Sequence, residues 1–434
     1  MTASARSHLW FLTAPMGVLL GGTSVQAQQI GDFLGSDIPY ELKRSYGTSV
    51  AERPHTELEP IGARVGSMIV FPKVELGTGF SSNVFGLTTN ALADGYVTLA
   101  PRVTAASQWS RNSLELTGAV GLIRFFSQSV RSQTAYSLQA NGRLDLGKSD
   151  SIIGIIGRQR AFETQYVGSF PQNAAGTVGY NRTNALVRGT FHFNRVSLVG
   201  SGTINDLVYS DTPSFSGPLI NQQFRNRTEY RTSARLQYDF NTDVQAFTEV
   251  SYSRHQYHTA ILGQPLRTNN GFRALAGANL DITPVIRAVV GVGYEQRVYV
   301  NPAYQPLRGL ALDARVEWLP TELTTVNLRV TRKVEDAILE NSPGFFSTIG
   351  QVRVDHELLR YVLVFAEATY ARDSFVTIPR RDAQFTLRAG GTYSLGRRFT
   401  IQPNVSYVQR RSKGLQQGQT FSEFRGGLNF TVQL

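Results

Sequence analysis

The chain has 434 residues, of which 43 are Lys or Arg, 32 are Asp or Glu and none is Cys, so its formal net charge is +11. The absence of cysteine excludes a disulfide framework and a thiolate metal site. A basic balance is often typical of nucleic-acid binding. Here the basic residues stand singly along the whole chain, and we therefore expect no nucleic-acid partner.

The N-terminus has the features of an export signal. Arg6 and His8 precede an apolar run over residues 9–20, and a small-x-small cleavage site ends at Ala27. A buried hydrophobic helix is the alternative interpretation of the run. No later apolar run reaches the length of about 18 residues that indicates a helical membrane span. We expect residues 1–27 to be a cleaved signal peptide.

Residues 28–65 are polar and mixed in charge, and they include Pro39, Pro54 and Pro60. We expect them to form a periplasmic N-terminal segment that precedes a membrane domain at residues 66–434. The segment is too short for the plug of a TonB-dependent transporter, a barrel of about 22 strands. It is also too short for the repeated periplasmic domains of an assembly-type barrel, so both classes are disfavoured.

Side-chain character alternates along the membrane domain, most clearly over residues 225–239. Arg227, Glu229 and Arg231 lie on one parity of this segment, whereas Tyr230 and other apolar residues lie on the opposite parity. A β-strand with one charged and one apolar face produces this pattern. Strands of globular proteins usually have about 5–6 residues, whereas a tilted membrane strand needs about 9–11. The length therefore favours a membrane strand.

The same alternation recurs often enough to predict about 18 strands, and the connections between them alternate in length. Short turns are expected near residues 110–111, 147–149, 194–195, 241–243, 283–284, 320–321, 359–360 and 396–397. Longer polar segments cover residues 83–95, 163–179, 210–224, 256–269, 300–306, 335–345 and 374–381. Outer-membrane barrels have short periplasmic turns, longer extracellular loops and an even number of strands. The predicted fold is thus an all-β transmembrane antiparallel barrel with both termini in the periplasm.

The C-terminal strand supports this interpretation, since Leu428, Phe430, Val432 and Leu434 form one apolar face that continues to the last residue. Barrel strands of the outer membrane typically end in this way, which implies recognition by the barrel-assembly machinery. The expected localisation is the outer membrane of a Gram-negative cell. Membrane lipid and lipopolysaccharide are the expected surroundings.

Charged residues on the inward parity are the candidate site. The pore-lining candidates are Arg227, Glu229, Arg231, Arg235, Arg273, Arg287, Arg315, Arg329, Arg353 and Arg388. Two interpretations stay open: a wet lumen whose charges pair across strands, or a net-positive channel that attracts anions. Arg227, Arg231 and Arg235 form a ladder with a spacing of about 7 Å per two residues, and Glu229 interrupts it.

No constellation of catalytic or metal-binding residues stands out. His255 and His258 are the nearest pair of histidines, but a spacing of three on a strand directs them to opposite faces. The His-centred sites of barrel proteases and phospholipases have no counterpart in the sequence. We therefore expect no metal, no cofactor and no enzymatic activity.

The start of the membrane domain carries a resemblance to a known family. Its residues are GSMIVFPKVELGTGFSSNVF at 66–85, followed by Asp94-Gly95-Tyr96, Leu99-Ala100-Pro101 and the run at 107–112. The pattern resembles the putative β-barrel porin family, whose members are often encoded with exopolysaccharide genes. The resemblance implies an outer-membrane channel for exopolysaccharide or other polar or anionic solutes, with anionic polysaccharide and periplasmic export components as partners. A non-conducting structural or surface-interaction barrel is the alternative, and an outer-membrane enzyme is less favoured.

Overall fold

The computed structural model describes residues 48–434 apart from 51–52, 54, 148, 262 and 340–341. The predicted signal peptide lies outside the described residues, as does the first part of the predicted periplasmic segment. No helix among the described residues is long and apolar enough to cross a membrane.

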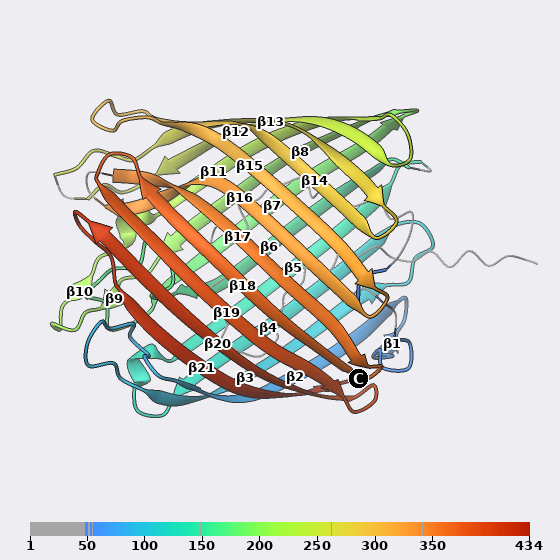
Figure 1. Cartoon of the computed structure of the whole chain (residues 1–434), viewed down its shortest axis with the longest axis horizontal. Helices are drawn as coiled ribbons and strands as arrows, with labels where there is room; N and C mark the ends of the chain where they lie inside the picture. Colours follow the sequence, from blue (N-terminus) through green and yellow to red (C-terminus); the bar gives the residue numbers. More distant parts are fainter. Residues whose placement is uncertain (1–47, 51–52, 54, 148, 262, 340–341) are drawn as a thin grey trace, which may run out of the picture.

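Eighteen antiparallel strands form a closed barrel (Figure 1), which confirms the predicted all-β antiparallel barrel of about 18 strands. They are β2 (Met68–Ser81), β3 (Asp94–Ser107), β4 (Ser113–Phe125), β5 (Gln133–Asp145), β6 (Ser151–Glu163), β7 (Val178–Phe193), β8 (Val196–Tyr209), β11 (Arg227–Asp239), β12 (Val244–Tyr257), β13 (Asn269–Thr283), β14 (Ile286–Tyr299), β15 (Leu307–Thr321), β16 (Thr324–Leu339), β17 (Ser342–Leu359), β18 (Val362–Phe375), β19 (Arg380–Ser394), β20 (Phe399–Gly414) and β21 (Phe421–Gln433).

The ring closes where β21 pairs with β2, from Lys73 opposite Gln433 to Ser81 opposite Arg425. Closure gives every strand two neighbours, so backbone groups at membrane depth find partners within the sheet. Short elements lie outside the ring of eighteen strands. They are β1 (Ala63–Val65), the hairpin of β9 (Thr212–Pro213) and β10 (Leu219–Ile220), and the 3-10 turns η2 (Ser129–Arg131) and η3 (Gln223–Arg225).

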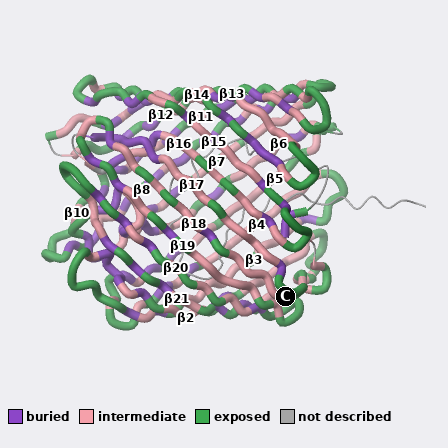
Figure 2. Tube along the Cα trace, in the orientation of Figure 1, coloured by how far each residue is buried: buried purple, intermediate pink, exposed green. Residues whose placement is uncertain are grey.

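The strands alternate between a buried polar face and an exposed apolar face, and Figure 2 shows buried and exposed residues interleaved along them. In β11 the side chains of Arg227, Glu229 and Arg235 are at most 4% exposed, whereas Leu236 is 55% exposed and Tyr230 43%. The polar face therefore lines the lumen and the apolar face forms the outer wall. Strands of 13 to 18 residues are long enough to cross a bilayer with tilt.

Strands β2, β3 and β20 contain Pro72, Pro101 and Pro403, each of which lacks a donor for the ladder. Pro101 falls in the gap of the β3 and β4 pairing between Leu99 and Arg102. Pro403 faces the interrupted part of the β19 and β20 pairing. Pro72 pairs with Val103 of β3 on one side and lies beyond the last paired residue of β21 on the other. Each of these three prolines thus lies where one of its two neighbouring strands has no residue paired with it.

The long connections gather at one end of the barrel and the short turns at the other; we call these the loop end and the turn end. The C-terminus and β1 lie at the turn end (Figure 1). One predicted loop is wrong, and another is shorter than predicted. Residues 335–345 are mostly strand, since β16 continues to Leu339 and β17 begins at Ser342, and only four residues separate β18 from β19. Polar residues there face the lumen, so their polarity does not indicate a loop.

Candidate functional site

The segment between β6 and β7, residues 164–177, crosses the lumen at the loop end; we call it the crossing loop. A Cβ atom on Gly168 would lie 3.0 Å from Asp373 Oδ2 of β18 and 3.4 Å from the ring of Phe345 of β17. Strands β6 and β18 are on nearly opposite sides of the ring, because the shorter way round passes β5, β4, β3, β2, β21, β20 and β19. Glycine at position 168 lets the backbone approach the far wall this closely.

A buried acid, Glu423 of β21, anchors the crossing loop. Its carboxylate accepts hydrogen bonds from Tyr166 Oη (2.5 Å) and Gln165 Nε2 (3.2 Å) of the loop. Ser81 Oγ (2.6 Å) and Arg425 Nε donate to the other carboxylate oxygen. Hydrogen bonds to an ionised acceptor are stronger than neutral ones, so this acid fixes the loop against the wall.

Two buried arginines bind the loop from other directions. Arg410 of β20 donates to the carbonyl oxygens of Gln165 (3.3 Å) and Tyr166 (3.2 Å). Arg131 donates to the carbonyl oxygen of Gly176 (2.9 Å) and to the side chain of Gln165. Burial lowers the pKa of Arg131 to about 10, so it remains charged at neutral pH. Burial and then the charge of Glu423 raise the pKa of Tyr166 well above its ordinary value, which keeps the phenol a donor.

A cavity of about 70 Å³ lies beneath the crossing loop. One wall, which we call the basic wall, comes from β8, η3, β11, β12 and the connection before β13. The opposite wall, the acidic wall, comes from β16 to β19. The basic wall carries Tyr209, Arg225, Arg227, Tyr257 and Arg267. The acidic wall carries Glu335, Asp336, Ser347, Asp373, Asp382 and Gln384, and Arg410 of β20 also lines the cavity. The lumen therefore presents separated charges on the two walls of this cavity.

The tyrosines of the basic wall position its arginines. The guanidinium carbon of Arg225 lies 4.0 Å from the centre of the Tyr209 ring, and that of Arg227 lies 5.6 Å from the centre of Tyr257. Arg225 also pairs with Glu163 (2.7 Å), which raises the pKa of Arg225 even though burial opposes the charge. Stacking on aromatic rings and ion pairing both favour the charged guanidinium.

The structure distributes the sequence candidates along the whole lumen, and of them only Arg227 lines the cavity. Most face a carboxylate. The closest ion pairs are Arg227 with Glu229 (2.8 Å), Arg235 with Glu249, Arg273 with Glu295 (3.8 Å), Arg287 with Glu317 (3.7 Å), Arg315 with Asp313 (3.5 Å), Arg353 with Asp355 (2.7 Å) and Arg388 with Glu367 (3.4 Å). Arg231 lies between Arg227 and Arg235 on β11, opposite Thr203 of β8. Arg329 lies opposite Arg315 and Gln351, and within the described residues it forms no ion pair.

Sequence reasoning missed the residues that shape the cavity, namely Tyr166, Arg225, Arg267, Asp373 and Arg410. They lie in connections or at strand ends, where alternation fades. The sequence did contain the polar pair Glu335-Asp336 of β16, but it lay in a segment that was interpreted as a loop.

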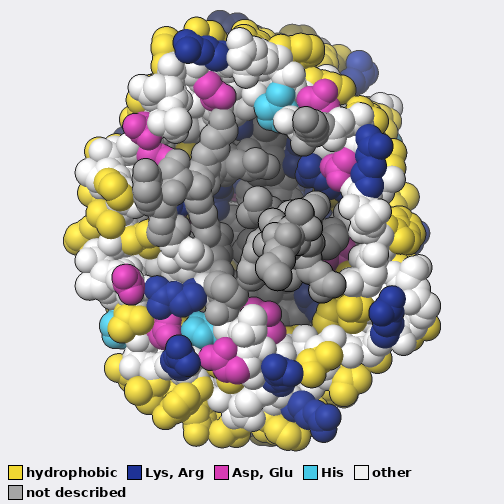
Figure 3. Space-filling view, turned by 90° about the vertical axis from the view of Figure 1, so that its right-hand side faces the viewer, with side chains coloured by type: hydrophobic (Ala, Val, Ile, Leu, Met, Phe, Trp, Pro, Cys, Tyr) yellow, Lys and Arg dark blue, Asp and Glu magenta, His cyan; other side chains and the backbone are white. Residues whose placement is uncertain are grey.

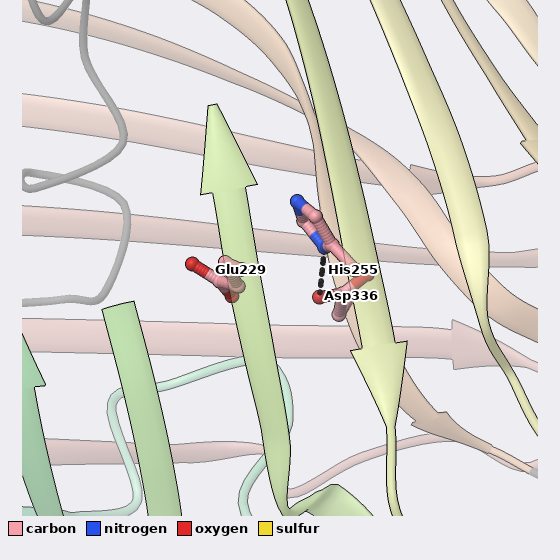
Figure 4. A group of neighbouring side chains, drawn as sticks. All are labelled: Glu229, His255 and Asp336. Carbon is pink, nitrogen blue, oxygen red and sulfur yellow. Dashed lines mark hydrogen bonds and ion pairs between the residues drawn. The ribbon is translucent and has the colours of Figure 1, made fainter. Parts of the chain in front are cut away.

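A second cluster borders the cavity, formed by Glu229, His255 and Asp336 (Figure 4). Potential ligand atoms of the three residues lie within 4.8 Å of one another, and His255 Nδ1 is 3.4 Å from Asp336 Oδ2. Arg227 approaches both acids, at 2.8 Å from Glu229 and 3.5 Å from Asp336, and Arg297 also pairs with Asp336. Two guanidinium groups supply the positive charge that a metal would bring, so the cluster is better explained as an ion-pair network.

The two nearest histidines in the sequence, His255 and His258, do not point to the same site. His255 is 1% exposed and faces the lumen, whereas His258 is exposed and its Nε2 lies 3.0 Å from Thr228 Oγ1. This agrees with the opposite directions expected from their spacing on a strand.

At the turn end, part of the N-terminal segment lies across one side of the opening. Val50 is 2% exposed, and its amide donates to Thr325 Oγ1 (2.9 Å) of β16. Arg53 pairs with Glu357 (2.7 Å) of β17. Figure 3 views the barrel from this end, with charged side chains nearer the middle of the view and hydrophobic side chains at the outer edge.

A closed ring of long strands with an apolar exterior and a charged lumen defines a transmembrane β-barrel of the outer-membrane type. The sequence model of the family described as "Putative beta-barrel porin 2" matches residues 56–434, and the chain belongs to this family. The resemblance seen in the sequence is thereby confirmed. No curated protein matches the chain.

Several solved outer-membrane barrels are similar in fold. OpdK of Pseudomonas aeruginosa is 9% identical with a TM-score of 0.48, covering 84% of this chain and 99% of that chain. OccAB3 of Acinetobacter baumannii is 8% identical with a TM-score of 0.46, covering 84% and 99%. A mutant of the ferric enterobactin receptor PfeA of Pseudomonas aeruginosa is 6% identical with a TM-score of 0.48, covering 84% and 80%. These similarities concern the barrel alone and give no information on a solute.

Proposed function

We propose that the protein is a narrow channel of the outer membrane that passes small polar solutes, anionic ones included. The observation that carries this proposal is the crossing loop, residues 164–177, which lies across a charged lumen and is anchored on Glu423. In this proposal the loop end faces the outside of the cell and both termini face the periplasm.

The charge of the lumen favours a water-filled path over a plain scaffold. A scaffold barrel could fill its interior with apolar side chains, which avoids the desolvation of charged groups. Here buried Arg235 and Glu249 pair inside the wall, and half-buried Arg329 adds a positive charge without an ion pair among the described residues. Charges along a pore in a low-dielectric wall set which ions enter it.

Export of exopolysaccharide, the other substrate class implied by the family resemblance, places a stricter demand on the loop. A polymer chain needs a path that is open along its whole length, and the crossing loop lies across the lumen on its contacts with Glu423, so the crossing loop would have to leave the lumen. Small solutes require only local movement of the loop. The contacts of Tyr166 and Gln165 with Glu423 therefore favour the small-solute channel.

Conductance in planar bilayers tests the proposal. The wild-type protein is expected to form small, stable channels, and replacement of residues 167–175 by a short Gly-Ser linker is expected to raise the single-channel conductance by about twofold or more, because it opens the constriction. A matched control replaces the exposed turn at residues 241–243 with Gly-Ser-Gly and should leave the conductance unchanged.

An absence of conductance in both the wild-type protein and the loop variant would refute the channel and favour a structural barrel. Block of the loop variant, but not of the wild type, by an anionic polysaccharide would indicate a polymer channel that opens only when the loop moves. Heat-modifiable migration in detergent gels identifies the folded barrel in every sample.

A further inference from the structure

We propose that the cavity beneath the crossing loop is a binding site for a small zwitterion, a solute with a carboxylate at one end and an ammonium group at the other. This inference rests on the proposed channel function and names the class of solute that the channel selects. It is based on the separation of charge between the basic and acidic walls of the cavity.

The basic wall presents three guanidinium groups to the cavity, those of Arg225, Arg227 and Arg267. Glu163 and Glu229, the nearest acidic partners of the first two, lie outside the lining of the cavity, whereas Asp336, which also pairs with Arg227 (3.5 Å), belongs to it. Arg267 is held in place by hydrogen bonds to the carbonyl oxygens of Ala337 (2.6 Å) and Leu339 (2.8 Å), and its guanidinium carbon lies 5.4 Å from the ring centre of Phe224. A planar donor fork on this wall suits a carboxylate.

The acidic wall has the opposite character. Asp373 of β18 and Asp382 of β19 are directly opposite each other in the register of the two strands. Asp382 binds Arg380 (2.7 Å) and Arg410 (2.9 Å), and Glu335 pairs with Lys333 (3.4 Å). Asp373, by contrast, accepts a hydrogen bond from Ser347 (2.7 Å) and within the described part of the chain forms no ion pair.

Like charges directly opposite on neighbouring strands destabilise a sheet. The carboxylate pair of Asp373 and Asp382 therefore gains stability from an additional cation, because Arg380 and Arg410 form ion pairs with Asp382 and no ion pair among the described residues includes Asp373. An ammonium group of a solute meets this need with a charge-assisted hydrogen bond. The acidic wall thus indicates the second half of the ligand.

The crossing loop completes the site by covering it. Gly168 approaches Asp373 so closely that a Cβ atom would stand 3.0 Å from Oδ2, and Tyr166 and Ser169 also line the cavity. Exclusion of bulk water lowers the effective dielectric constant and strengthens each ionic contact. The volume of about 70 Å³ restricts the ligand to a few heavy atoms.

A solute with one charge does not satisfy both walls. A simple anion is attracted by the three arginines but repelled by Asp373, Asp382 and Glu335. A simple cation is attracted by these acids but repelled by the arginines. Only a solute with both groups is attracted by both walls. Glycine, acetate and methylammonium distinguish a zwitterion site from an anion site and a cation site. Acetate has only the carboxylate of glycine, and methylammonium has only its ammonium group.

Flux of labelled glycine into liposomes that contain the full-length barrel tests the site. We expect the wild-type flux to saturate with concentration, and acetate and methylammonium to compete only at concentrations at least about tenfold higher than glycine itself. Asp373→Asn and Arg267→Gln are each expected to raise the half-saturating concentration of glycine about tenfold, equivalent to about 1.4 kcal/mol. The control Asp145→Asn removes the same charge near the turn end and should leave it unchanged.

A glycine flux that rises linearly with concentration in a conducting wild-type channel would overturn the zwitterion site and leave the proposed channel intact. Competition by acetate as strong as by glycine, with no effect of Asp373→Asn, would overturn it in favour of an anion site. If Asp373→Asn does not yield a heat-modifiable barrel, Arg267→Gln on the opposite wall decides the same question. An absence of any conductance refutes the proposed function itself.

Discussion

At the residue scale, the inward arginines behave as members of ion pairs rather than as isolated charges. Arg235 is 1% exposed and pairs with Glu249 on the neighbouring strand, and Arg227 contacts both Glu229 and Asp336. Breaking a buried pair from one side leaves an uncompensated charge, which costs about 3–5 kcal/mol. Substitution of these arginines therefore changes the lumen in two ways, since it removes a positive charge and exposes a negative one.

The selectivity of the channel should depend on the arginine ladder of β11. Replacement of Arg227, Arg231 and Arg235 by Gln is expected to shift a weak anion preference towards cations, because Glu229 and Glu249 then lose their partners. The shift should be clear at low salt and fade near 1 M, where the Debye length is about 3 Å. Reversal potentials across a salt gradient measure it.

Arg254→Gln serves as the control for this experiment, since Arg254 is exposed on β12 opposite Tyr230 of the outer wall. A triple variant with the same reversal potential as the wild-type channel would show that these arginines only form ion pairs within the barrel wall and that other groups determine ion selectivity.

At the scale of elements, the crossing loop depends on a few polar contacts rather than on a large apolar core. Phe170 and Ala174 pack into a small cluster with Tyr180, Leu207 and Tyr209 near the start of β7. Beyond that cluster, Gln165 and Tyr166 reach Glu423 by hydrogen bonds. An element held in this way is a candidate for local opening without unfolding of the barrel.

Removal of one contact should loosen the loop measurably. Tyr166→Phe deletes the hydrogen bond to the carboxylate of Glu423, and a bond to a charged acceptor contributes about 1.5–3 kcal/mol. We expect more frequent and longer openings to a higher conductance level in single-channel recordings. The wild-type contact should persist into alkaline solution, because the pKa of Tyr166 is raised well above its ordinary value and the phenol keeps its proton.

Tyr230→Phe removes a phenol from the outer wall, where Tyr230 is 43% exposed, and should leave the recordings unchanged. Indistinguishable recordings for Tyr166→Phe and the wild-type channel would mean that Arg410 and Arg131 suffice to hold the loop.

At the scale of the whole molecule, the barrel separates its connections by length. The short turns share one end with the C-terminus and β1, and the long connections, including the β9 and β10 hairpin, occupy the other end (Figure 1). An even number of strands places the first and last strand ends on the same side. Orientation in the membrane then decides which end meets the cell exterior.

The cysteine-free sequence makes this orientation directly testable. A membrane-impermeant maleimide should label Ser216→Cys, in an exposed loop-end position, on intact cells. It should label Asp243→Cys, in a turn-end position, only after the outer membrane is permeabilised. The reverse labelling pattern would place the long loops in the periplasm and refute the proposed orientation.

The sequence by itself determined the class of fold and the two faces of its clearest strands. The alternation of charged and apolar side chains over residues 225–239 indicates the two faces of β11. A side chain on a strand points inward or outward according to its odd or even position alone. The lengths of the connections added the closed antiparallel order. Errors arose where lumen-facing polar residues, such as Glu335 and Asp336, were interpreted as a loop.

Only the tertiary structure decided which parts of the chain meet inside the barrel. The contacts of Tyr166 with Glu423 and of Gly168 with Asp373 join residues more than 200 positions apart, across a ring that must close before they form. The odd or even position of a residue along a strand determines whether its side chain points into the lumen. Which other side chains it contacts there depends on strand order, register and the path of a loop. The cavity and its two charged walls therefore follow from closure of the barrel, which brings distant polar groups together in a small volume.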